Sequence, residues 1–223
     1  MPFLNLHAHS TYSDGSDSIE AMAKVFKQHG HAAFVLTDHD DIVVALTTQT
    51  WQKIKDECDS VSKKMNGYPI LSGLEIYVPG EECLLFGDKA CQEWLSLLEV
   101  NTRQGLQLPT IKNWIRSMIT RNLLFSLVLC HPSLRCIDPD FYSLLDGYEV
   151  MNAGQMWSDD MISRMKQLMP TAKPFRNLDA HSTTDIIMEC NEISPETARS
   201  LFKPNDNKSN MKRLIGWIKQ PEA

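Results

Sequence analysis

Histidines and carboxylates recur along this 223-residue chain in short groups that could bind metal ions. Two imidazoles one residue apart on an extended strand face the same side, so His7 and His9 can share one cation. Asp179 and His181 repeat that spacing with one oxygen and one nitrogen ligand. The candidate metal ligands are His7, His9, Asp14, His39, Glu75, His131, Asp179 and His181. Such mixed donors suit Zn, Mn or Fe, whereas Ca or Mg alone would prefer more oxygen.

Each of these residues taken alone has an ordinary structural explanation. Asp14 fits a turn that leads into a helix cap, His39 fits a solvated loop, and a lone histidine such as His131 is more often structural than metal-bound. A second histidine pair, His29 and His31, lies at a predicted helix end, where capping or exposure is expected instead of ligation. The metal hypothesis therefore depends on whether the chain brings the candidate ligands together.

The elements that must position these residues can be predicted from hydrophobic periodicity. Short apolar runs predict strands at 3–6, 33–37, 70–75, 123–130, 148–152 and 175–179. Helical spacing predicts helices at 18–29, 50–64, 92–102, 111–121, 159–168 and 195–202, and a C-terminal helix near 207–219 that packs on the body. Alternating strands and helices are typical of an α/β protein with a mostly parallel sheet, here interrupted by a hairpin around 80–82. The candidate ligands follow five of the strands, whose carboxyl ends share one face in a parallel barrel.

Composition limits the classes of protein that this chain can be. With 43% hydrophobic residues, one domain over residues 1–223 is expected. A net charge of -6 disfavours long nucleic acids, whose binding depends on neutralising phosphates. No apolar stretch suits a membrane span and no secretory signal is recognisable, while the six cysteines lack the spacing of a disulfide framework or zinc knuckle. We therefore expect a cytoplasmic protein without a membrane partner.

Taken together and in this order, the motifs resemble those of the PHP family, the polymerase and histidinol phosphatase superfamily. The matching segments are His7-Ala8-His9, Ser13-Asp14-Gly15, Thr37-Asp38-His39, Gly73-Leu74-Glu75, His131-Pro132 and Asp179-Ala180-His181. The resemblance implies a distorted (β/α)7 barrel of the PHP type. It also implies hydrolysis of phosphomonoesters or phosphodiesters at a centre of two or three divalent metal ions.

The resemblance further implies a role for each residue. His7, His9, Glu75 and Asp179 would hold one ion, Asp14, His39 and His181 a second, and Glu75 would bridge to a third that His131 also holds. The third ion normally takes another histidine, and the best-placed residue here is Cys83, which is a departure from the family pattern. A buried, inert thiol is the favoured alternative for Cys83. Asp14, His39 and His181 are the candidate catalytic residues. Arg135 and Arg176 are candidate phosphate-binding residues because each lies near a ligand in sequence, although both also fit a surface position.

The expected reaction is attack on phosphorus by a metal-activated hydroxide, with a small phosphomonoester as the first-choice substrate. A phosphodiesterase or 3'-5' exonuclease that acts on short nucleic acids or nucleotides is the alternative. A non-catalytic metal-binding module of the same fold is an alternative of another class. An amidohydrolase-type barrel would also be rich in His and Asp, but the sequence lacks that group's metal-bridging lysine signature and carries Ser13-Asp14-Gly15.

Overall fold

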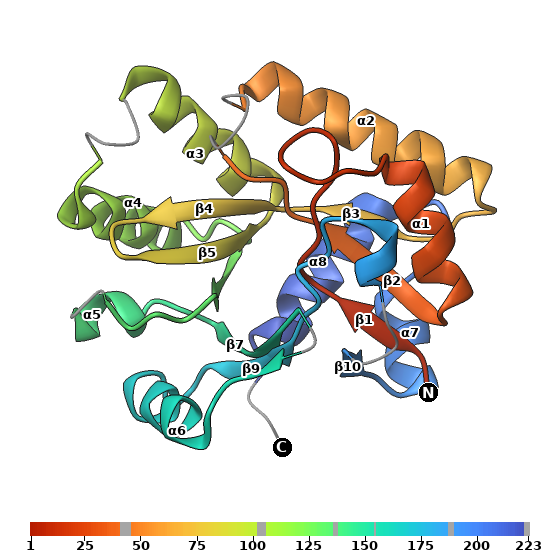
Figure 1. Ribbon diagram of the computed structural model, residues 1–223. Helices are drawn as coiled ribbons and strands as arrows, with labels where there is room; N and C mark the ends of the chain where they lie inside the picture. Colours follow the sequence, from red (N-terminus) through yellow and green to blue (C-terminus); the bar gives the residue numbers. More distant parts are fainter. Residues whose placement is uncertain (41–45, 102–105, 136–137, 154, 187–189, 221–223) are drawn as a thin grey trace.

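The computed structural model describes residues 1–40, 46–101, 106–135, 138–153, 155–186 and 190–220 (Figure 1). Its strands are β1 (Phe3–Asn5), β2 (His31–Leu36), β3 (Ile70–Ser72), β4 (Leu74–Val78), β5 (Glu81–Phe86), β6 (Ser126–Cys130), β7 (Gly147–Asn152), β8 (Gln155–Met156), β9 (Lys173–Arg176) and β10 (Asn191–Glu192). Its helices are α1 (Ile19–Gln28), α2 (Thr48–Lys64), α3 (Asp88–Val100), α4 (Leu108–Thr120), α5 (Pro139–Tyr142), α6 (Asp159–Leu168), α7 (Pro195–Leu201) and α8 (Asn207–Ile218), and a 3-10 turn covers Thr183–Asp185.

The strands form two mixed sheets, with helices arranged around them (Figure 1). One sheet has the order β10-β1-β2-β3, and the other has the order β4-β5-β6-β7-β8 with β9 also paired to β7. Neighbouring strands are parallel from β1 to β3 and from β6 to β7 to β9, whereas β5 is antiparallel to both β4 and β6. The predicted α/β class and the hairpin are therefore confirmed.

Two isolated parallel bridges connect the sheets beyond the ends of their strands. Ala8, after β1, pairs with Ala180, after β9, and His39, after β2, pairs with Glu75 in β4. Gly73 alone separates β3 from β4, and a Cβ there would lie 2.7 Å from the Phe86 ring and 2.9 Å from the Leu85 carbonyl oxygen. Gly73 joins β3 of one sheet to β4 of the other, and only glycine lets the backbone lie so close to β5 at this point. Glu75 follows two residues later in β4.

The strands carry apolar side chains on both faces, as expected for a sheet whose two faces are both buried. Along β5, Cys83 and Leu85 lie in a helix-facing cluster with residues such as Trp51 and Trp94. Leu84 and Phe86 lie in a second cluster, which we call the strand–α8 cluster. Its members include Leu4, Leu6, Val35, Leu84, Phe86, Val128, Cys130, Phe175, Leu214, Ile215 and Ile218. Leu214, Ile215 and Ile218 of α8 thus pack against strand residues in this cluster.

Several local expectations have clear outcomes. Ser18 caps α1 by accepting a hydrogen bond from the Ala21 amide, as the predicted start at residue 18 requires. His29 occupies the C-cap of that helix, whereas His31 is buried in β2 beside Phe26, so exposure was the wrong expectation for it.

The remaining general expectations concern cysteines, membrane spans and one helix boundary. The five described cysteines form no disulfide with one another, while Cys136 and residue 102 of the predicted 92–102 helix lie outside the described residues. No helix in the described parts of the chain combines the length and apolar content needed to cross a bilayer.

Substitution of Trp94 by Phe should destabilise the protein by about 1.5–3 kcal/mol, the usual contribution of a hydrogen bond to a charged group. The Trp94 indole N–H donates to Asp40 Oδ2 at 2.8 Å, and both side chains are buried. Urea unfolding monitored by circular dichroism would measure the change. Trp114→Phe is the matched control, because the neighbouring Trp114 N–H has no hydrogen-bond partner among the described residues. Equal losses in both variants would show that packing, not this hydrogen bond, is responsible.

Candidate metal centre

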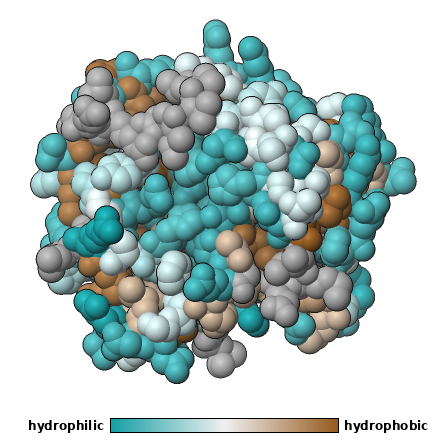
Figure 2. Space-filling model, in the orientation of Figure 1, coloured by the Kyte–Doolittle hydropathy of each residue, from teal (hydrophilic) through white to brown (hydrophobic). Residues whose placement is uncertain are grey.

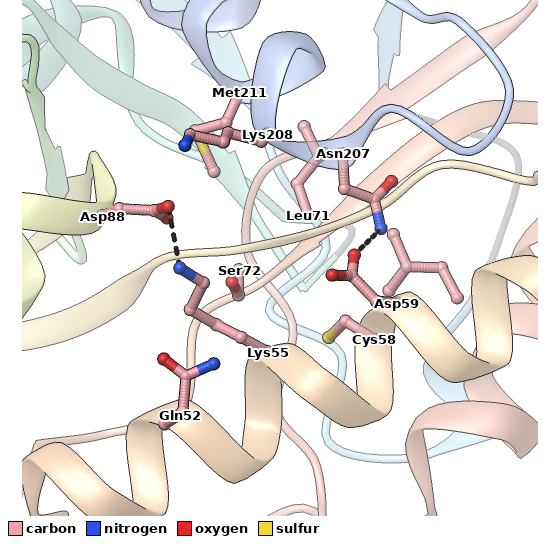
Figure 3. Close-up of a pocket in the computed structure, with 11 residues that line it drawn as sticks. Gln52, Lys55, Cys58, Asp59, Leu71, Ser72, Asp88, Asn207, Lys208 and Met211 are labelled. Carbon is pink, nitrogen blue, oxygen red and sulfur yellow. Dashed lines mark hydrogen bonds and ion pairs between the residues drawn. The ribbon is translucent and has the colours of Figure 1, made fainter.

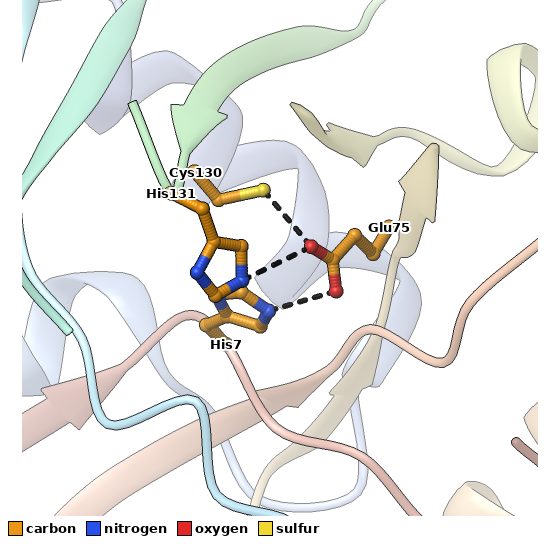
Figure 4. A group of neighbouring side chains, drawn as sticks. All are labelled: His7, Glu75, Cys130 and His131. Atoms are coloured by element: carbon orange, nitrogen blue, oxygen red, sulfur yellow. Dashed lines mark hydrogen bonds and ion pairs between the residues drawn. The ribbon is translucent and has the colours of Figure 1, made fainter. Parts of the chain in front are cut away.

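The structure brings the eight predicted ligand residues together, with the Glu75 carboxylate in the middle. Glu75 lies in β4 and is 1% exposed. Its Oε2 is 3.0 Å from His7 Nε2, 3.1 Å from His9 Nε2 and 3.5 Å from His39 Nδ1. Its Oε1 is 3.3 Å from His131 Nε2 (Figure 4). One carboxylate therefore touches imidazoles that follow three different strands, β1, β2 and β6.

Asp179 provides a second shared carboxylate opposite Glu75. Its Oδ1 lies 3.2 Å from His7 Nε2 and 3.1 Å from His9 Nε2, and its Oδ2 lies 3.4 Å from His131 Nε2. Both Asp179, at φ 50°, and His131, at φ 44°, adopt the left-handed backbone region that L-residues rarely occupy. Such conformations cost about 1–3 kcal/mol each and cluster at functional sites. The fold therefore retains local strain at the two positions where these side chains turn toward the centre.

Asp14, His39 and His181 form the outer part of the cluster. Asp14 Oδ2 lies 3.5 Å from His39 Nε2 and 3.2 Å from His181 Nε2, and the His39 and His181 rings both stack on His9. The Asp14 side chain is 29% exposed and that of His181 is 39% exposed, whereas His9 is fully buried. Hydrophilic side chains also gather in the middle of the face shown in Figure 2. The cluster thus has a closed interior and a side that a substrate could reach.

The charges of the centre compensate one another in the absence of a cation. Burial by itself lowers the pKa of His7, but the nearby Glu75, Asp179 and Glu149 carboxylates outweigh it and raise the pKa well above the usual value. Burial likewise opposes the carboxylates around His9, yet its pKa rises to about 9. Burial would raise the pKa of Glu75, but the surrounding histidines hold it well below the usual range. Protonated imidazoles therefore stand where cations would neutralise the carboxylates.

The donor atoms of the cluster fit divalent ions. Four overlapping groups of ligand atoms lie within 4.8 Å of one another: His7, His9, Glu75 and Asp179; His9, Asp14, His39 and His181; His7, Glu75, Cys130 and His131; and His39, Glu75 and Glu82. His9 Nε2 lies 3.1 Å from both Glu75 Oε2 and Asp179 Oδ1, but among the described residues neither ring nitrogen of His9, nor Asp179 Oδ1, makes a hydrogen bond of good geometry. Buried ligand-type atoms that converge at contact distance without hydrogen-bond alignment match what a bound cation would satisfy.

Glu149 was not predicted from the sequence, although it supports two of the histidines. This buried β7 carboxylate lies 2.8 Å from His7 Nδ1, and its Oε2 accepts the backbone N–H of His131 at 3.2 Å. Because a carboxylate only accepts, it places the His7 proton on Nδ1 and leaves Nε2 to face Glu75 and Asp179. The signal available in the sequence was an acidic residue inside an otherwise apolar strand, which requires compensation.

Replacing Glu149 by Gln should lower metal affinity by about 10- to 100-fold, the usual effect of removing a carboxylate that orients a ligand histidine. The amide keeps the size of the side chain, but its NH2 group would face donors, because the Asn152 and Asn177 amides also donate to Glu149. Competition against a fluorescent zinc chelator would measure the affinity. Glu192→Gln, at an exposed position of β10, is the control. An affinity within twofold of wild type would refute the orienting role.

Two residues close to the candidate ligands in sequence, Asp38 and Cys83, have other partners in the structure. Asp38 follows β2 beside His39, but its carboxylate accepts the Ser10 N–H, the Ser10 hydroxyl and the Ser13 hydroxyl, all within 2.9 Å. It therefore holds the loop that carries Asp14. Cys83 was the best-placed substitute for a third-site histidine, with a buried, inert thiol as the favoured alternative, and its side chain lies buried in the helix-facing cluster. The alternation of β5 turns Cys83 away from the face that carries Glu75.

The two arginines chosen as phosphate-binding residues are both exposed. Arg135 donates its backbone N–H to the Ser133 hydroxyl. Arg176 lines a separate pocket together with Lys173, Glu192 and Trp217, none of which belongs to the cluster. The structure therefore brings Arg176 to another cavity, and phosphate binding by Arg135 stays a prediction.

Another cavity, of about 200 Å³, lies between α2, β3 and the start of α8 (Figure 3). An ion pair of 2.7 Å between Lys55 and Asp88 crosses it, and Asn207 donates to Asp59 at 2.8 Å. None of the eight predicted ligands lines this cavity. It is a feature separate from the metal-type cluster.

Comparisons with known proteins point to one family. The model of the PHP domain family matches residues 5–117. A curated relative, the DNA polymerase/3'-5' exonuclease PolX of Bacillus subtilis (strain 168), is 29% identical over 92 residues. That alignment covers 40% of this chain but 16% of the relative, so the chain corresponds to a small part of that protein.

Solved structures share the fold at low sequence identity. A candidate metal-dependent phosphoesterase from Bifidobacterium adolescentis has a TM-score of 0.58 at 15% identity, with 89% of this chain and 95% of that chain covered. An amidohydrolase from Chromobacterium violaceum, solved with bound sulfate and no metal, gives 0.54 at 14% identity, covering 94% and 96%. A two-domain protein from Bacteroides vulgatus with a predicted PHP-like phosphoesterase gives 0.51 at 17% identity, covering 82% and 53%.

Proposed function

The chain belongs to the PHP domain family, and we propose that it is a metal-dependent hydrolase of phosphoesters that acts first on a small phosphomonoester. The observation that carries the proposal is the convergence of ligand-type side chains from five separate segments around Glu75. Residues retained only for stability would not need buried ring nitrogens that contact carboxylates without an aligned hydrogen bond, as those of His9 do. A non-catalytic metal-binding module is therefore the weaker alternative.

We assign the ligand roles as the resemblance implies. His7, His9, Glu75 and Asp179 would hold one ion in the closed interior, and Asp14, His39 and His181 would hold a second at the exposed side. Two or three divalent ions, of Zn, Mn or Fe, suit this nitrogen and oxygen donor set. Arg135, four residues after His131 in the sequence, remains a candidate phosphate-binding residue.

Divalent ions bound here would supply a low-pKa water as nucleophile and would neutralise the phosphoryl oxygens. The chain's own residues would do the rest. Glu149 Oε1, 2.8 Å from His7 Nδ1, would keep the ring proton on Nδ1. Asp38 accepts hydrogen bonds from Ser10 and Ser13 and so holds the turn that positions Asp14. The exposed edges of Asp14 and His181 would be first to meet a substrate, while the buried interior excludes water.

Two other substrate classes each have one supporting observation. The PolX relative is named as a 3'-5' exonuclease, which favours a phosphodiesterase acting on short nucleic acids or nucleotides. The net charge of -6 opposes long nucleic acids, so this reading ranks second. The Chromobacterium neighbour is named as an amidohydrolase, which favours hydrolysis of amides. At 14% identity that likeness extends to the fold alone.

We also propose that the strands form a closed seven-stranded ring of the distorted barrel type. Three observations support it: β3 and β4 are continuous through Gly73, β9 pairs with β7, and the Ala8–Ala180 bridge connects the segment after β9 to that after β1. The ring order would be β1, β2, β3 with β4, β5, β6, β7 and β9. The carboxyl ends of the parallel strands would form one end of this ring, and the eight candidate metal ligands would lie there.

A hydrolysis panel would test the function directly. After reconstitution with Mn, Zn or Fe, we expect turnover of p-nitrophenyl phosphate and phosphorylated metabolites to exceed that of nucleotide diesters, oligonucleotides and N-acyl amino acids. His9→Ala should abolish the activity, because both of its ring nitrogens lie inside the cluster. Preferred cleavage of oligonucleotides or amides would select one of the alternatives. Full turnover by His9→Ala would contradict the assigned site.

A further inference from the structure

The two oxygens of Glu75 divide the centre into two positions. On the Oε2 side lie His7, His9 and His39, which are nitrogen donors. On the Oε1 side lie His131 Nε2 at 3.3 Å and the Cys130 thiol, whose Sγ donates to the same oxygen at 3.2 Å (Figure 4). A carboxylate whose oxygens face different donor sets can bridge two cations. The second position would then have sulfur among its ligands.

Cys130 reaches this position because of the register of the sheet. It is the last residue of β6 and lies directly opposite Glu82 of β5. Cys130 is fully buried, and its side chain belongs to the strand–α8 cluster, at the end nearest Glu75. In Figure 4 its sulfur points at the carboxylate from the side opposite His7. A thiol that only filled apolar space would not need to be directed at a carboxylate that four histidines contact.

Cys83 provides an internal comparison. It is equally buried and lies on β5, next to Cys130's strand, opposite Leu129. Its side chain packs in the helix-facing cluster, and it is absent from every described group of ligand-type atoms. The two thiols are therefore equally buried, but their side chains point to opposite faces of the sheet.

We propose that Cys130 ligates a cation on the Oε1 side of Glu75 as a thiolate, together with His131 Nε2 and Glu75 Oε1. The inference rests on the proposed metal centre and adds to it the identity of a ligand and of the ion. Binding converts the thiol into a metal thiolate and releases its proton to solvent, so no oxidant or further reactant is needed. Thiolate is a soft ligand, and it selects zinc over manganese or magnesium.

X-ray absorption at the zinc edge of the reconstituted wild-type protein tests the ligand without any variant. A zinc–sulfur shell near 2.3 Å, beside nitrogen and oxygen at about 2.0–2.1 Å, is the expected result. Zinc bound with nitrogen and oxygen ligands alone would overturn the inference while leaving the proposed hydrolase intact. Failure to bind any zinc, manganese or iron would overturn both.

Cobalt(II) substitution assigns the sulfur to a residue. The wild-type protein should show the intense near-ultraviolet absorption of a sulfur-to-cobalt charge transfer, and Cys130→Ser should lose it. Cys83→Ser should keep it. Melting curves of both variants, each recorded with zinc, establish that they are folded. Should Cys130→Ser fail to fold, the zinc-edge spectrum of a Cys83→Ser, Cys136→Ser double variant decides, because among the described cysteines Cys130 alone belongs to a group of ligand-type atoms. Loss of the band in Cys83→Ser and its retention in Cys130→Ser would refute the assignment.

Discussion

Glu75→Gln is expected to reduce kcat/KM for phosphoester hydrolysis by more than about a hundredfold. Loss of a group that only orients a metal ligand costs about 10- to 100-fold, and the loss of a ligand itself should exceed that range. Glu75 lies within 3.5 Å of four histidines, so it is more central than any orienting residue. Gln keeps the shape of the side chain but removes its charge and turns one oxygen into a donor. Bound metal, measured by elemental analysis of the same preparation, should fall together with turnover.

The control for this variant is Glu93→Gln. Glu93 lies on α3 and accepts two hydrogen bonds from Arg121, the C-cap residue of α4; neither residue contacts a predicted ligand in any described ion pair or hydrogen bond. It should keep both metal and activity. If Glu75→Gln retained wild-type turnover with a full complement of metal, the bridging role of Glu75 and the division of the centre into two positions would both be wrong.

The elements were predictable because most of them obey local rules. The helix expected at 159–168 has those bounds in the structure, since Ser158 caps its start and Asp159 and Asp160 occupy its first turn. Strand ends were less certain. The run at 70–75 divides into β3 and β4 at Gly73, because close approach to β5 rather than any turn signal places the break there.

The site residues that directly follow predicted strands could be identified from the sequence. The residues whose side-chain direction depends on the pairing register of the strands could not. Periodicity alone could not tell whether Cys83 or Cys130 faces Glu75, because a shift of one residue exchanges the two faces of a strand. Glu149 was missed for a related reason. Its neighbours are apolar in sequence, and its partners His7 and Asn177 come from segments 142 and 28 residues away.

Arg176 illustrates the opposite error, in which closeness in sequence was mistaken for closeness in space. It precedes Asp179 by three residues, but it is the exposed last residue of β9, whereas Asp179 lies beyond the strand and itself adopts the left-handed backbone region. A residue three positions from a ligand can therefore line a different cavity.

Removal of metal by a chelator is expected to abolish activity and to lower the melting temperature. Ions that bind only the folded state stabilise it by about 2.7 kcal/mol at a hundred times their Kd. For a chain of this size each kcal/mol shifts the melting temperature by roughly 2–4 °C, which predicts a decrease of about 5–11 °C. Differential scanning calorimetry before and after chelation, and again after zinc is restored, would measure it. Because the metal-free centre is already compensated by protonated His7 and His9, the fold should survive chelation. An unchanged melting temperature and unchanged turnover in chelator would mean that these residues are held together for a purpose other than binding cations.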